Sequence, residues 1–181
     1  MVQALIDLIN NESYEETSVK EVFSCFHCSK DADVDHFLKD CAIQHEKQKL
    51  ARTYLILDDD ELEKGNIKLN GYFTIAIKSL KFSETTSNTT KKDMAKSKTC
   101  THVAGYLLAQ LAKDDTMDKG YGKIILDTAV AYIKNAQKCV GGRFVYIDCK
   151  DCLIDYYKKN SFKYIQKNQD DNTLNQMYII L

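Results

Sequence analysis

The chain has 181 residues, of which 44% are hydrophobic and 28% are charged, and its formal net charge is −1. These values place it among globular proteins, and the length predicts a single domain spanning residues 1–181. No apolar run reaches the ~18 residues that cross a bilayer, and the N-terminal stretch lacks the basic start of a secretory signal, so a cytoplasmic protein without membrane contact is expected. The near-zero charge gives no overall attraction to nucleic acid, although it leaves local basic patches open.

Seven cysteines cannot all pair within one chain, and free thiols are expected without a secretory signal. Two C-x-x-C pairs, Cys25/Cys28 and Cys149/Cys152, have a spacing found in zinc sites. They lie far apart in the sequence, and Cys149 falls at the end of a predicted strand. We therefore expect reduced cysteines and no metal.

The first half of the chain is predicted to begin with helices and to continue with strands. The helix around residue 38 follows from apolar residues at i, i+3, i+4, i+7 and i+8, with Asp31 or Asp33 as its N-cap. The acidic run Asp58–Glu61 is expected to be a solvated turn. The predicted elements are a helix at Gln3–Ile9, a strand at Val19–Phe26, a helix over residues 34–42, a strand at Ala51–Asp58 and a strand at Ile67–Leu80.

Ser83–Thr99 is rich in Ser, Thr, Asn and Lys, which predicts a flexible insertion. Two interpretations stay open for this segment: a solvated loop, or a surface that contacts phosphates of a substrate. Its basic residues are Lys91, Lys92, Lys96 and Lys98.

The stretch from Val103 to Gln137 predicts a strand, a glycine loop and a helix. Val103–Ala112 is an apolar run of strand length, and Gly120-Tyr121-Gly122 precedes an apolar stripe with helical spacing over Gly122–Gln137. Glycines at a helix start let a ligand approach the backbone, and the first amides of a helix lack intrahelical acceptors. This is the arrangement of a phosphate site, which Lys119 and Lys123 would complement, although a plain loop-to-helix joint fits the same residues.

The remainder of the chain predicts a parallel strand, a short helix and a terminal hairpin. Gly141-Gly142 ends the long helix, and the strand–helix–strand passage calls for parallel pairing with a right-handed crossover. The fold class is therefore α/β, with a central mixed sheet and helices on both faces. The predicted elements are a strand at Arg143–Cys149, a helix at Asp151–Asn160, and a hairpin of Phe162–Ile165 and Met177–Leu181.

Met117–Gly122 (MDKGYG) resembles the (Q/R)-x-x-G-x-(G/A) motif with which the GNAT superfamily of N-acetyltransferases binds acetyl-coenzyme A. Met117 stands at the Gln/Arg position, so that side-chain contact is absent while the main-chain part is kept. Tyr156–Phe162 is similar to the late GNAT motif Phe-Tyr-x-x-x-Gly-Phe, with Ser161 at the glycine. The stretch from Phe23 to Leu80 resembles the opening of a prokaryotic subgroup that includes toxins acetylating aminoacyl-tRNA.

The resemblance implies a GNAT-like fold that binds acetyl-CoA mostly through main-chain groups, and it assigns the general acid to Tyr157. A phenol with pKa near 10 can protonate the departing thiolate at neutral pH, although packing against Leu153 and Ile154 would also explain Tyr157. A backbone amide near Leu111 or Ala112 would polarise the acetyl carbonyl. The implied coenzyme-binding residues are Leu111, Ala112, Met117, Asp118, Lys119, Gly120, Tyr121, Gly122 and Lys123.

A general base is not identified by the sequence. His102, before the central strand, and Asp148, at the end of the next strand, are both candidates. An unperturbed histidine pKa near 6.5 suits the task, but the position of His102 favours the more ordinary role of a surface histidine at a strand end. An acceptor amine of low pKa, such as that of an aminoacyl ester, would need no strong base.

The leading functional hypothesis is an acyltransferase that moves the acetyl group of acetyl-CoA to a primary amine by direct attack in a ternary complex. The acceptor would be a small molecule or a protein amine, and the chain a monomer or homodimer. A more specific alternative is a toxin that acetylates the α-amine of aminoacyl-tRNA. An alternative of another class is a non-catalytic acyl-CoA-binding or interaction module that keeps the fold.

Overall fold

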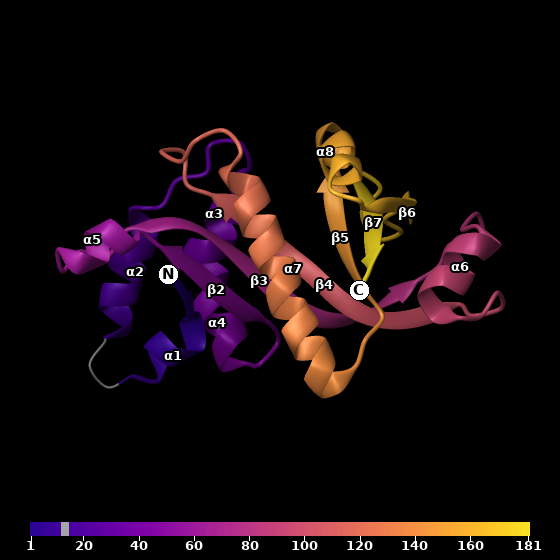
Figure 1. Cartoon of the computed structure of the whole chain (residues 1–181), viewed down its shortest axis with the longest axis horizontal. Coiled ribbons are helices and arrows are strands. Elements are labelled where there is room, and N and C mark those ends of the chain that lie inside the picture. The colour runs from indigo at the N-terminus through magenta and orange to yellow at the C-terminus, as the bar shows by residue number, and fades with distance from the viewer. Residues whose placement is uncertain (12–14) are drawn as a thin grey trace. The chain divides into compact units, whose positions relative to one another are not determined.

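The computed structural model describes residues 1–11 and 15–181 (Figure 1). Its sheet has seven strands in the order β1-β2-β3-β4-β5-β7-β6, so the fourth strand is the central one, as predicted. Pairing of β4 with β5 is parallel, whereas β1/β2, β2/β3, β5/β7 and β6/β7 are antiparallel. The strands are β1 Val2–Ala4, β2 Arg52–Leu57, β3 Leu69–Lys81, β4 His102–Lys113, β5 Phe144–Lys150, β6 Lys163–Lys167 and β7 Leu174–Ile180.

Helix α7, Tyr121–Val140, has 20 residues and is the longest helix described. It ends where Gly141 and Gly142 take positive φ angles, a conformation that costs glycine little. The other helices are α1 Leu5–Ile9, α2 Glu16–Ser24, α3 Ala32–His36, α4 Ala42–Lys47, α5 Asp59–Glu63, α6 Asn88–Ala95 and α8 Ile154–Lys159, with a π-helical turn at Phe37–Cys41 and a 3₁₀ turn at Asp151–Leu153.

The chain divides into two compact units, each built from two segments. Unit 1 comprises Met1–Ala76 and Gln110–Ala129, and unit 2 comprises Ile77–Ala109 and Val130–Leu181. Strands β3 and β4 and helix α7 therefore contribute residues to both units. The single domain expected from the length stays a prediction.

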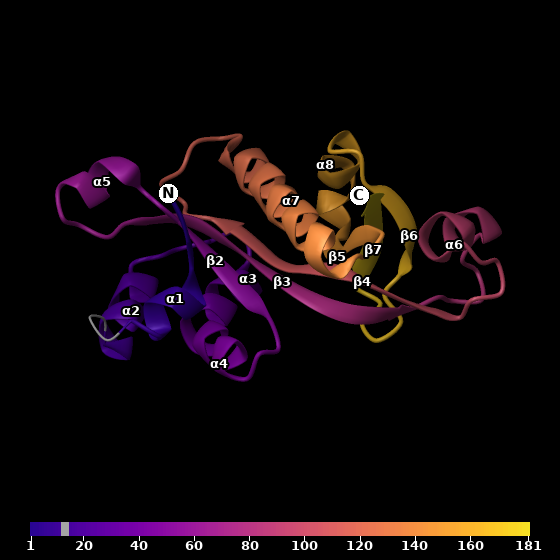
Figure 2. The ribbon, with the colours of Figure 1, turned by 60° about the horizontal axis from the view of Figure 1, so that its bottom comes forward.

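Unit 1 packs helices on both faces of its strands (Figure 2). On one face, residues of α1, α2 and the α3–α4 segment form a buried cluster with Leu55, Leu57 and Tyr72. The Tyr72 hydroxyl donates to the Val34 carbonyl over 2.5 Å. On the opposite face, a Cβ added to Gly71 would come within 2.5 Å of Ile125 in α7, so the helix sits where a side chain is missing.

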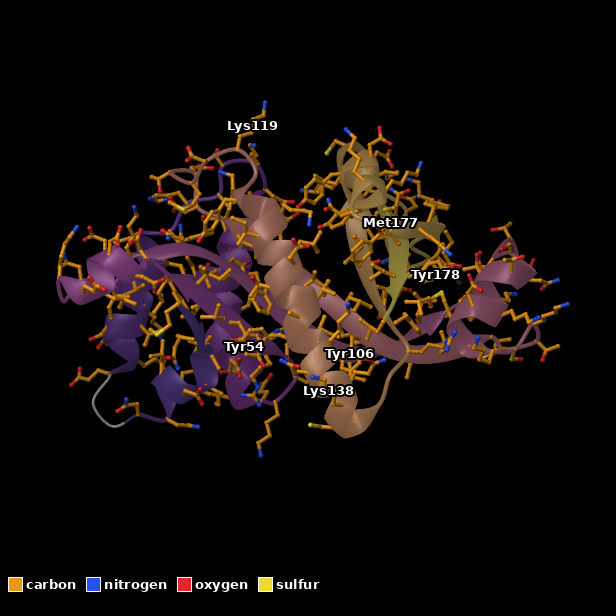
Figure 3. All side chains as sticks on the ribbon, in the orientation of Figure 1. Tyr54, Tyr106, Lys119, Lys138, Met177 and Tyr178 are labelled. Atoms are coloured by element: carbon orange, nitrogen blue, oxygen red, sulfur yellow. The ribbon has the colours of Figure 1, made fainter. Side chains whose placement is uncertain are left out.

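Unit 2 has a separate core formed by β4, β5, β7 and the α6 segment. Its buried members include Leu107, Phe144 and Tyr146, together with Met94 of α6 and Tyr178 of β7 (Figure 3 labels Tyr178). The expected terminal hairpin is present as β6 and β7, and β7 lies between β5 and β6.

The strand predicted at Val19–Phe26 is wrong, because these residues belong to helix α2 and the turn after it. Val19, Phe23 and Phe26 are separated by four and three residues, so they fall on one helical face and are all buried. The segment is short and rich in residues that favour strands, so its helical spacing could not be recognised from the sequence.

Three further differences concern helix starts. The predicted helix at Gln3–Ile9 begins at Leu5, because Val2–Ala4 pairs with β2 as β1. The acidic run is helix α5 rather than a turn, capped by Asp58, whose carboxylate accepts the Glu61 amide over 3.2 Å. The segment expected as an insertion contains α6, which begins where the Ser87 hydroxyl accepts the Thr90 amide.

Among the described helices, none is both long and apolar enough to cross a membrane.

Candidate functional site

The loop between β4 and α7 lies in unit 1 and ends at Gly120. The φ angle of Gly120 is +112°, which L-residues with a Cβ rarely adopt. Apart from the two neighbouring residues in the chain, no atom of the described residues lies within 4 Å of a Cβ built there. Helix α7 begins at the next residue. The glycine therefore turns the chain into the helix and leaves the approach to its first amides open.

Two amides of this loop are used internally. The Tyr121 amide donates to the Asp118 carbonyl over 3.2 Å, and the Lys123 amide donates to the Gly120 carbonyl over 2.9 Å. Within residues 1–11 and 15–181, the amides of Lys119, Gly120 and Gly122 make no backbone hydrogen bond. These donors lie at the positive end of a 20-residue helix, so the arrangement suits a phosphate or pyrophosphate.

The lysines that flank the glycines differ in their surroundings. Lys119 is exposed and its side chain extends away from the loop (Figure 3). Lys123 forms an ion pair with Asp127 one turn later, so part of its charge is already compensated. Lys119 is therefore the freer of the two cations for an anionic ligand.

The loop is held in place by two carboxylates that the sequence analysis did not single out. Asp114 accepts the His27 amide over 2.9 Å with one oxygen and the Thr116 amide and hydroxyl with the other. Asp115 accepts the Ser29 amide over 2.9 Å, and its own amide donates to the His27 carbonyl. We call these contacts the Asp114–Asp115 brace. An Asp pair directly after a strand was its only sequence signal.

Met117 takes part in this loop through its main chain. The Lys113 ammonium donates to the Met117 carbonyl over 2.6 Å and to the Asp114 carbonyl over 3.2 Å. The side chain of Met117 is half-buried, and it has no group that could bind a phosphate.

Leu111 and Ala112, the two residues expected to polarise the acetyl carbonyl, present their main-chain groups to opposite edges of β4. The Ala112 carbonyl lies near Gly71 of β3, and the Asp114 amide donates to the Asn70 carbonyl there. Successive residues of a strand present their N–H and C=O groups to alternate edges. Leu111 therefore presents its amide to the edge away from β3, and it is the better candidate of the pair.

Tyr157 lies on α8 in unit 2, and its ring is 8% exposed. Its ring meets Phe162 edge-on, with centroids 5.5 Å apart, which fits the spacing of the late motif. Burial raises the pKa of the Tyr157 hydroxyl well above its usual value, and Cys149 and Tyr156 add to this effect. The phenol is thus protonated at neutral pH. No described residue forms a hydrogen bond with its hydroxyl.

Strands β4 and β5 part beyond a short parallel pairing in unit 2. Tyr106 pairs with Val145 and Leu107 with Tyr146, whereas the next residues of unit 2, Leu108 and Ala109, have no partner in the described part of β5. Both strands continue beyond this point. The main-chain groups of Leu108 and Ala109 on this side of β4 are consequently open to bonds with a ligand.

His102 is not brought near Tyr157. It is exposed at the first residue of β4, where its ring bonds with the adjacent Thr101 hydroxyl. His102 lies four residues before Tyr106 on β4, whereas Cys149 lies four residues after Val145, the partner of Tyr106 on β5. The two are therefore roughly 26 Å apart along the parallel strands. Tyr157 is close to Cys149, so the two predicted catalytic side chains lie toward opposite ends of β5.

All seven cysteines are free thiols. Burial raises the pKa of the Cys149 thiol to about 11, so it is not a thiolate at neutral pH. Across the described residues, no group of three or more His, Cys, Asp or Glu side chains is arranged to hold a metal ion.

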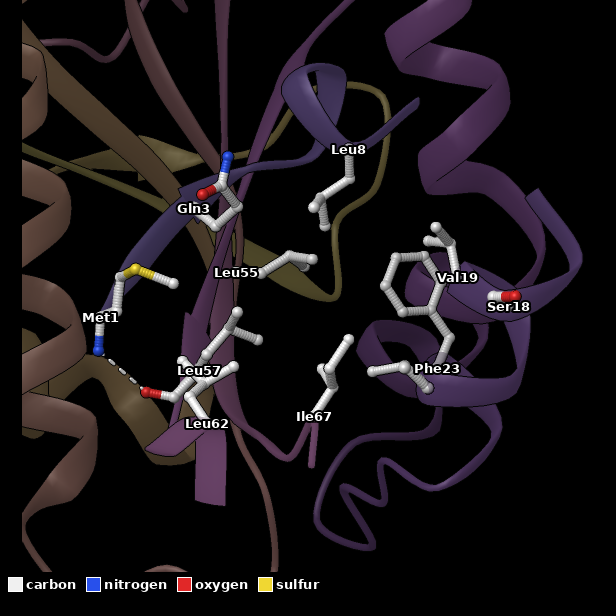
Figure 4. Close-up of a pocket in the computed structure, with 11 residues that line it drawn as sticks. Met1, Gln3, Leu8, Ser18, Val19, Phe23, Leu55, Leu57, Leu62 and Ile67 are labelled. Carbon is white, nitrogen blue, oxygen red and sulfur yellow. Dashed lines mark hydrogen bonds between the residues drawn. The ribbon is translucent and has the colours of Figure 1, made fainter. Parts of the chain in front are cut away.

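A cavity lies in unit 1, under α2 (Figure 4). Its volume is about 100 Å³ and its walls are mainly apolar, including Val19, Phe23, Leu55 and Ile67. It is too small and too apolar to receive a nucleotide.

The seven-stranded mixed sheet, with the glycine loop before α7, has the GNAT-like fold. The chain has this fold in common with the toxin AtaT in complex with acetyl-methionyl-tRNAfMet, with a TM-score of 0.72 and 14% identity over 99% of this chain and 94% of that chain. A tyrosine-to-phenylalanine variant of KacT is similar with a TM-score of 0.72 and 17% identity, over the same shares of the two chains.

AtaTR bound with acetyl-CoA gives a TM-score of 0.70 and 16% identity, covering 99% of this chain and 92% of that chain. No family model matches the sequence, and no curated protein matches it. At identities of this size, the likeness establishes the fold.

Proposed function

We propose that this chain is an acetyl-CoA-dependent N-acetyltransferase whose acceptor is the α-amine of an aminoacyl-tRNA. The support from the comparisons is that similar structures include AtaT with acetyl-methionyl-tRNAfMet and AtaTR with acetyl-CoA. The free amides at the start of α7 and the protonated Tyr157 supply the chemistry that such a transfer requires.

The observation that carries the choice of acceptor is the division of charge between the two units. Unit 2 contains 14 Lys and Arg against seven Asp and Glu, a net charge of +7, whereas unit 1 contains 11 against 19, a net charge of −8. The overall value of −1 therefore conceals a strongly basic half. A basic half of this kind favours a polyphosphate acceptor over a small neutral amine.

Part of this charge is carried by helix α6 and the residues after it. The helix is attached to unit 2 because the Arg143 side chain donates to the Asp93 carbonyl and the Tyr178 hydroxyl to the Asp93 carboxylate. Met94 is buried in the unit 2 core. The lysines are thus held by an ordered element, which lowers the entropy lost when they bind phosphates. They are Lys91, Lys92, Lys96 and Lys98.

In the proposed reaction, the amides around Gly120 bind the coenzyme pyrophosphate and the Leu111 amide polarises the acetyl carbonyl. The acceptor nitrogen attacks the carbonyl carbon, the C–S bond breaks, and the Tyr157 hydroxyl gives its proton to the departing sulfur. Tyr157 can serve as the donor in this step because its phenol is protonated at neutral pH.

The test is to incubate the full chain with radiolabelled acetyl-CoA and a panel of acceptors: aminoacyl-tRNAs, the same tRNAs without amino acid, aminoacyl methyl esters, polyamines and peptides. We expect label on aminoacyl-tRNA, none on uncharged tRNA, and much slower labelling of the methyl esters. Faster labelling of a polyamine or peptide would leave the acetyltransferase but overturn the acceptor. Acetyl-CoA binding without labelling of any acceptor would instead support a non-catalytic module.

A further inference from the structure

We propose that Asp148 is the general base of this transfer, taking the proton that the acceptor nitrogen loses on acetylation. The inference rests on the proposed function. It begins from the register of unit 2, in which β5 runs without irregularity against β7 from Phe144 to Lys150. Side chains of a regular strand alternate between faces, so Asp148 and Cys149 point to opposite faces of β5.

Tyr157 and Asp148 consequently lie near the same end of β5 but on different faces. Tyr157 is close to Cys149, whereas Asp148 is on the face of Tyr146. This is also the point where β4 has stopped pairing with β5. In the tetrahedral intermediate, nitrogen and sulfur are different substituents of one carbon, so acid and base must approach it from different directions. The two faces of an unpaired strand edge meet this requirement.

The carboxylate of Asp148 is fixed in orientation. One oxygen accepts from the side-chain amide of Asn168 over 2.9 Å and from the side-chain amide of Gln176 over 3.1 Å. Gln176 in turn accepts from the buried Gln166, whose amide also donates to the Lys81 carbonyl. No described residue forms a hydrogen bond with the second carboxylate oxygen, and the side chain is only half-buried, so this oxygen can take a proton.

The surroundings of Asp148 also raise its basicity. Burial raises its pKa above that of an ordinary aspartate, and hydrogen bonds from Gln176 and Asn168 offset part of this rise. The other charged or titratable groups around it are Lys78 on β3, Asp170 in the β6–β7 turn, and Tyr146 and Cys149 on β5. The raised pKa makes this carboxylate a stronger base than one in water.

The protons of the step balance. The acceptor N–H proton goes to Asp148, the Tyr157 proton goes to the coenzyme sulfur, and the products are the amide and the free thiol. Exchange with solvent then returns a proton to Tyr157 and removes one from Asp148. Neither His102 nor a metal ion is required.

The test compares Asp148→Asn with Asp170→Asn in the full chain. The asparagine oxygen of Asp148→Asn can still accept from Asn168 and Gln176, so the variant loses the base and keeps the contacts. We expect kcat/KM for aminoacyl-tRNA to fall at least about 100-fold, within the range for a positioned base. The melting temperature and the acetyl-CoA Kd from calorimetry should stay at parental values. Asp170→Asn removes the same charge nearby and should retain turnover.

A pH profile gives a second readout. The rate of the parent should fall in acid as both Asp148 and the acceptor amine become protonated, whereas Asp148→Asn should keep only the dependence due to the amine. Parental turnover in Asp148→Asn would overturn the inference and leave the proposed function standing. Equal losses of turnover, acetyl-CoA affinity and melting temperature would also overturn it, because they indicate a structural role. A parent chain that acetylates no acceptor would refute the proposed function and this inference together.

Discussion

Tyr157 is the side chain on which the enzymatic interpretation depends most. Tyr157→Phe keeps the ring against Phe162 and removes only the hydroxyl, so the fold and acetyl-CoA affinity should hold. A contribution confined to the transition state should appear as a fall in kcat of roughly 10²-fold or more, with little change in KM. Steady-state kinetics on an acceptor that the parent acetylates would measure it.

Tyr156→Phe is the matched control, because Tyr156 is the adjacent residue of α8 and points about 100° away around the helix. Its turnover should stay within a factor of a few of the parent. Equal activity of Tyr157→Phe and the parent would assign Tyr157 to core packing.

Gly120 allows a direct test of the coenzyme loop. Valine at this position is unfavourable at a φ of +112° and would place a side chain in the open space beside the glycine, so Gly120→Val should abolish acetyl-CoA binding. Met117→Ala should bind acetyl-CoA almost as the parent does, because Met117 contributes its carbonyl rather than its side chain. Calorimetry with acetyl-CoA compares the two, and normal binding by Gly120→Val would refute the site.

Ser161 provides a prediction about stability. Its φ of +69° is a left-handed conformation, which costs a non-glycine residue roughly 1–2 kcal/mol, so Ser161→Gly should raise the free energy of unfolding by about 1 kcal/mol. Ser79→Gly, at an exposed position within β3, should instead lower it by roughly 0.5–1 kcal/mol. Urea unfolding of the two variants decides whether the backbone conformation is the cause.

At the scale of elements, the Asp114–Asp115 brace ties the β4–α7 loop to residues 27–29. Burial would raise the pKa of Asp114, but hydrogen bonds from Thr116 and the His27 amide outweigh it and hold the pKa below its usual range. The ionised carboxylate therefore stabilises the fold above the ordinary aspartate pKa near 3.9, and this contribution is lost as the pH falls through the lower native value.

Asp114→Asn should accordingly lower the free energy of unfolding at pH 7 by roughly 2 kcal/mol, the scale of a buried hydrogen bond to a charged group. Its stability should also depend less on pH between about 5 and 2 than that of the parent. Acetyl-CoA affinity should fall because the loop is less ordered. Asp118→Asn, an exposed carboxylate of the same loop, should change none of these quantities.

At the scale of the whole molecule, the opposite charges of the two units determine what a nucleic acid would contact. Replacing Lys91, Lys92, Lys96 and Lys98 by Gln should weaken aminoacyl-tRNA binding and reduce the slope of log K against log salt by up to about 0.7–0.9 per lost phosphate contact. The same exchange at Lys30, Lys49, Lys64 and Lys68 of unit 1 should leave binding and slope unchanged. Equal effects of both sets would show that the charge division has no role in binding.

The sequence by itself determined the features that depend on neighbouring residues. The strand, glycine loop and helix from Val103 to Gln137 were predicted correctly because side-chain period and glycine conformation are local properties. The short apolar run Val19–Phe26 was predicted as a strand, because a run of that length is compatible with both periods until its packing face is known.

Only the tertiary structure decided the features that join distant residues. The brace connects Asp114 to His27, which are 87 residues apart, and no local pattern encodes such a contact. The register of β5 against β4 separated His102 from Tyr157, and tertiary packing brought Tyr157 close to Cys149, beside the Asp148 that the sequence had already placed at a strand end. The opposite net charges of the two units also could not be recognised from the sequence, because they depend on which distant segments come together. Each unit combines two segments of the chain, so the sum over the sequence averages a basic half with an acidic one.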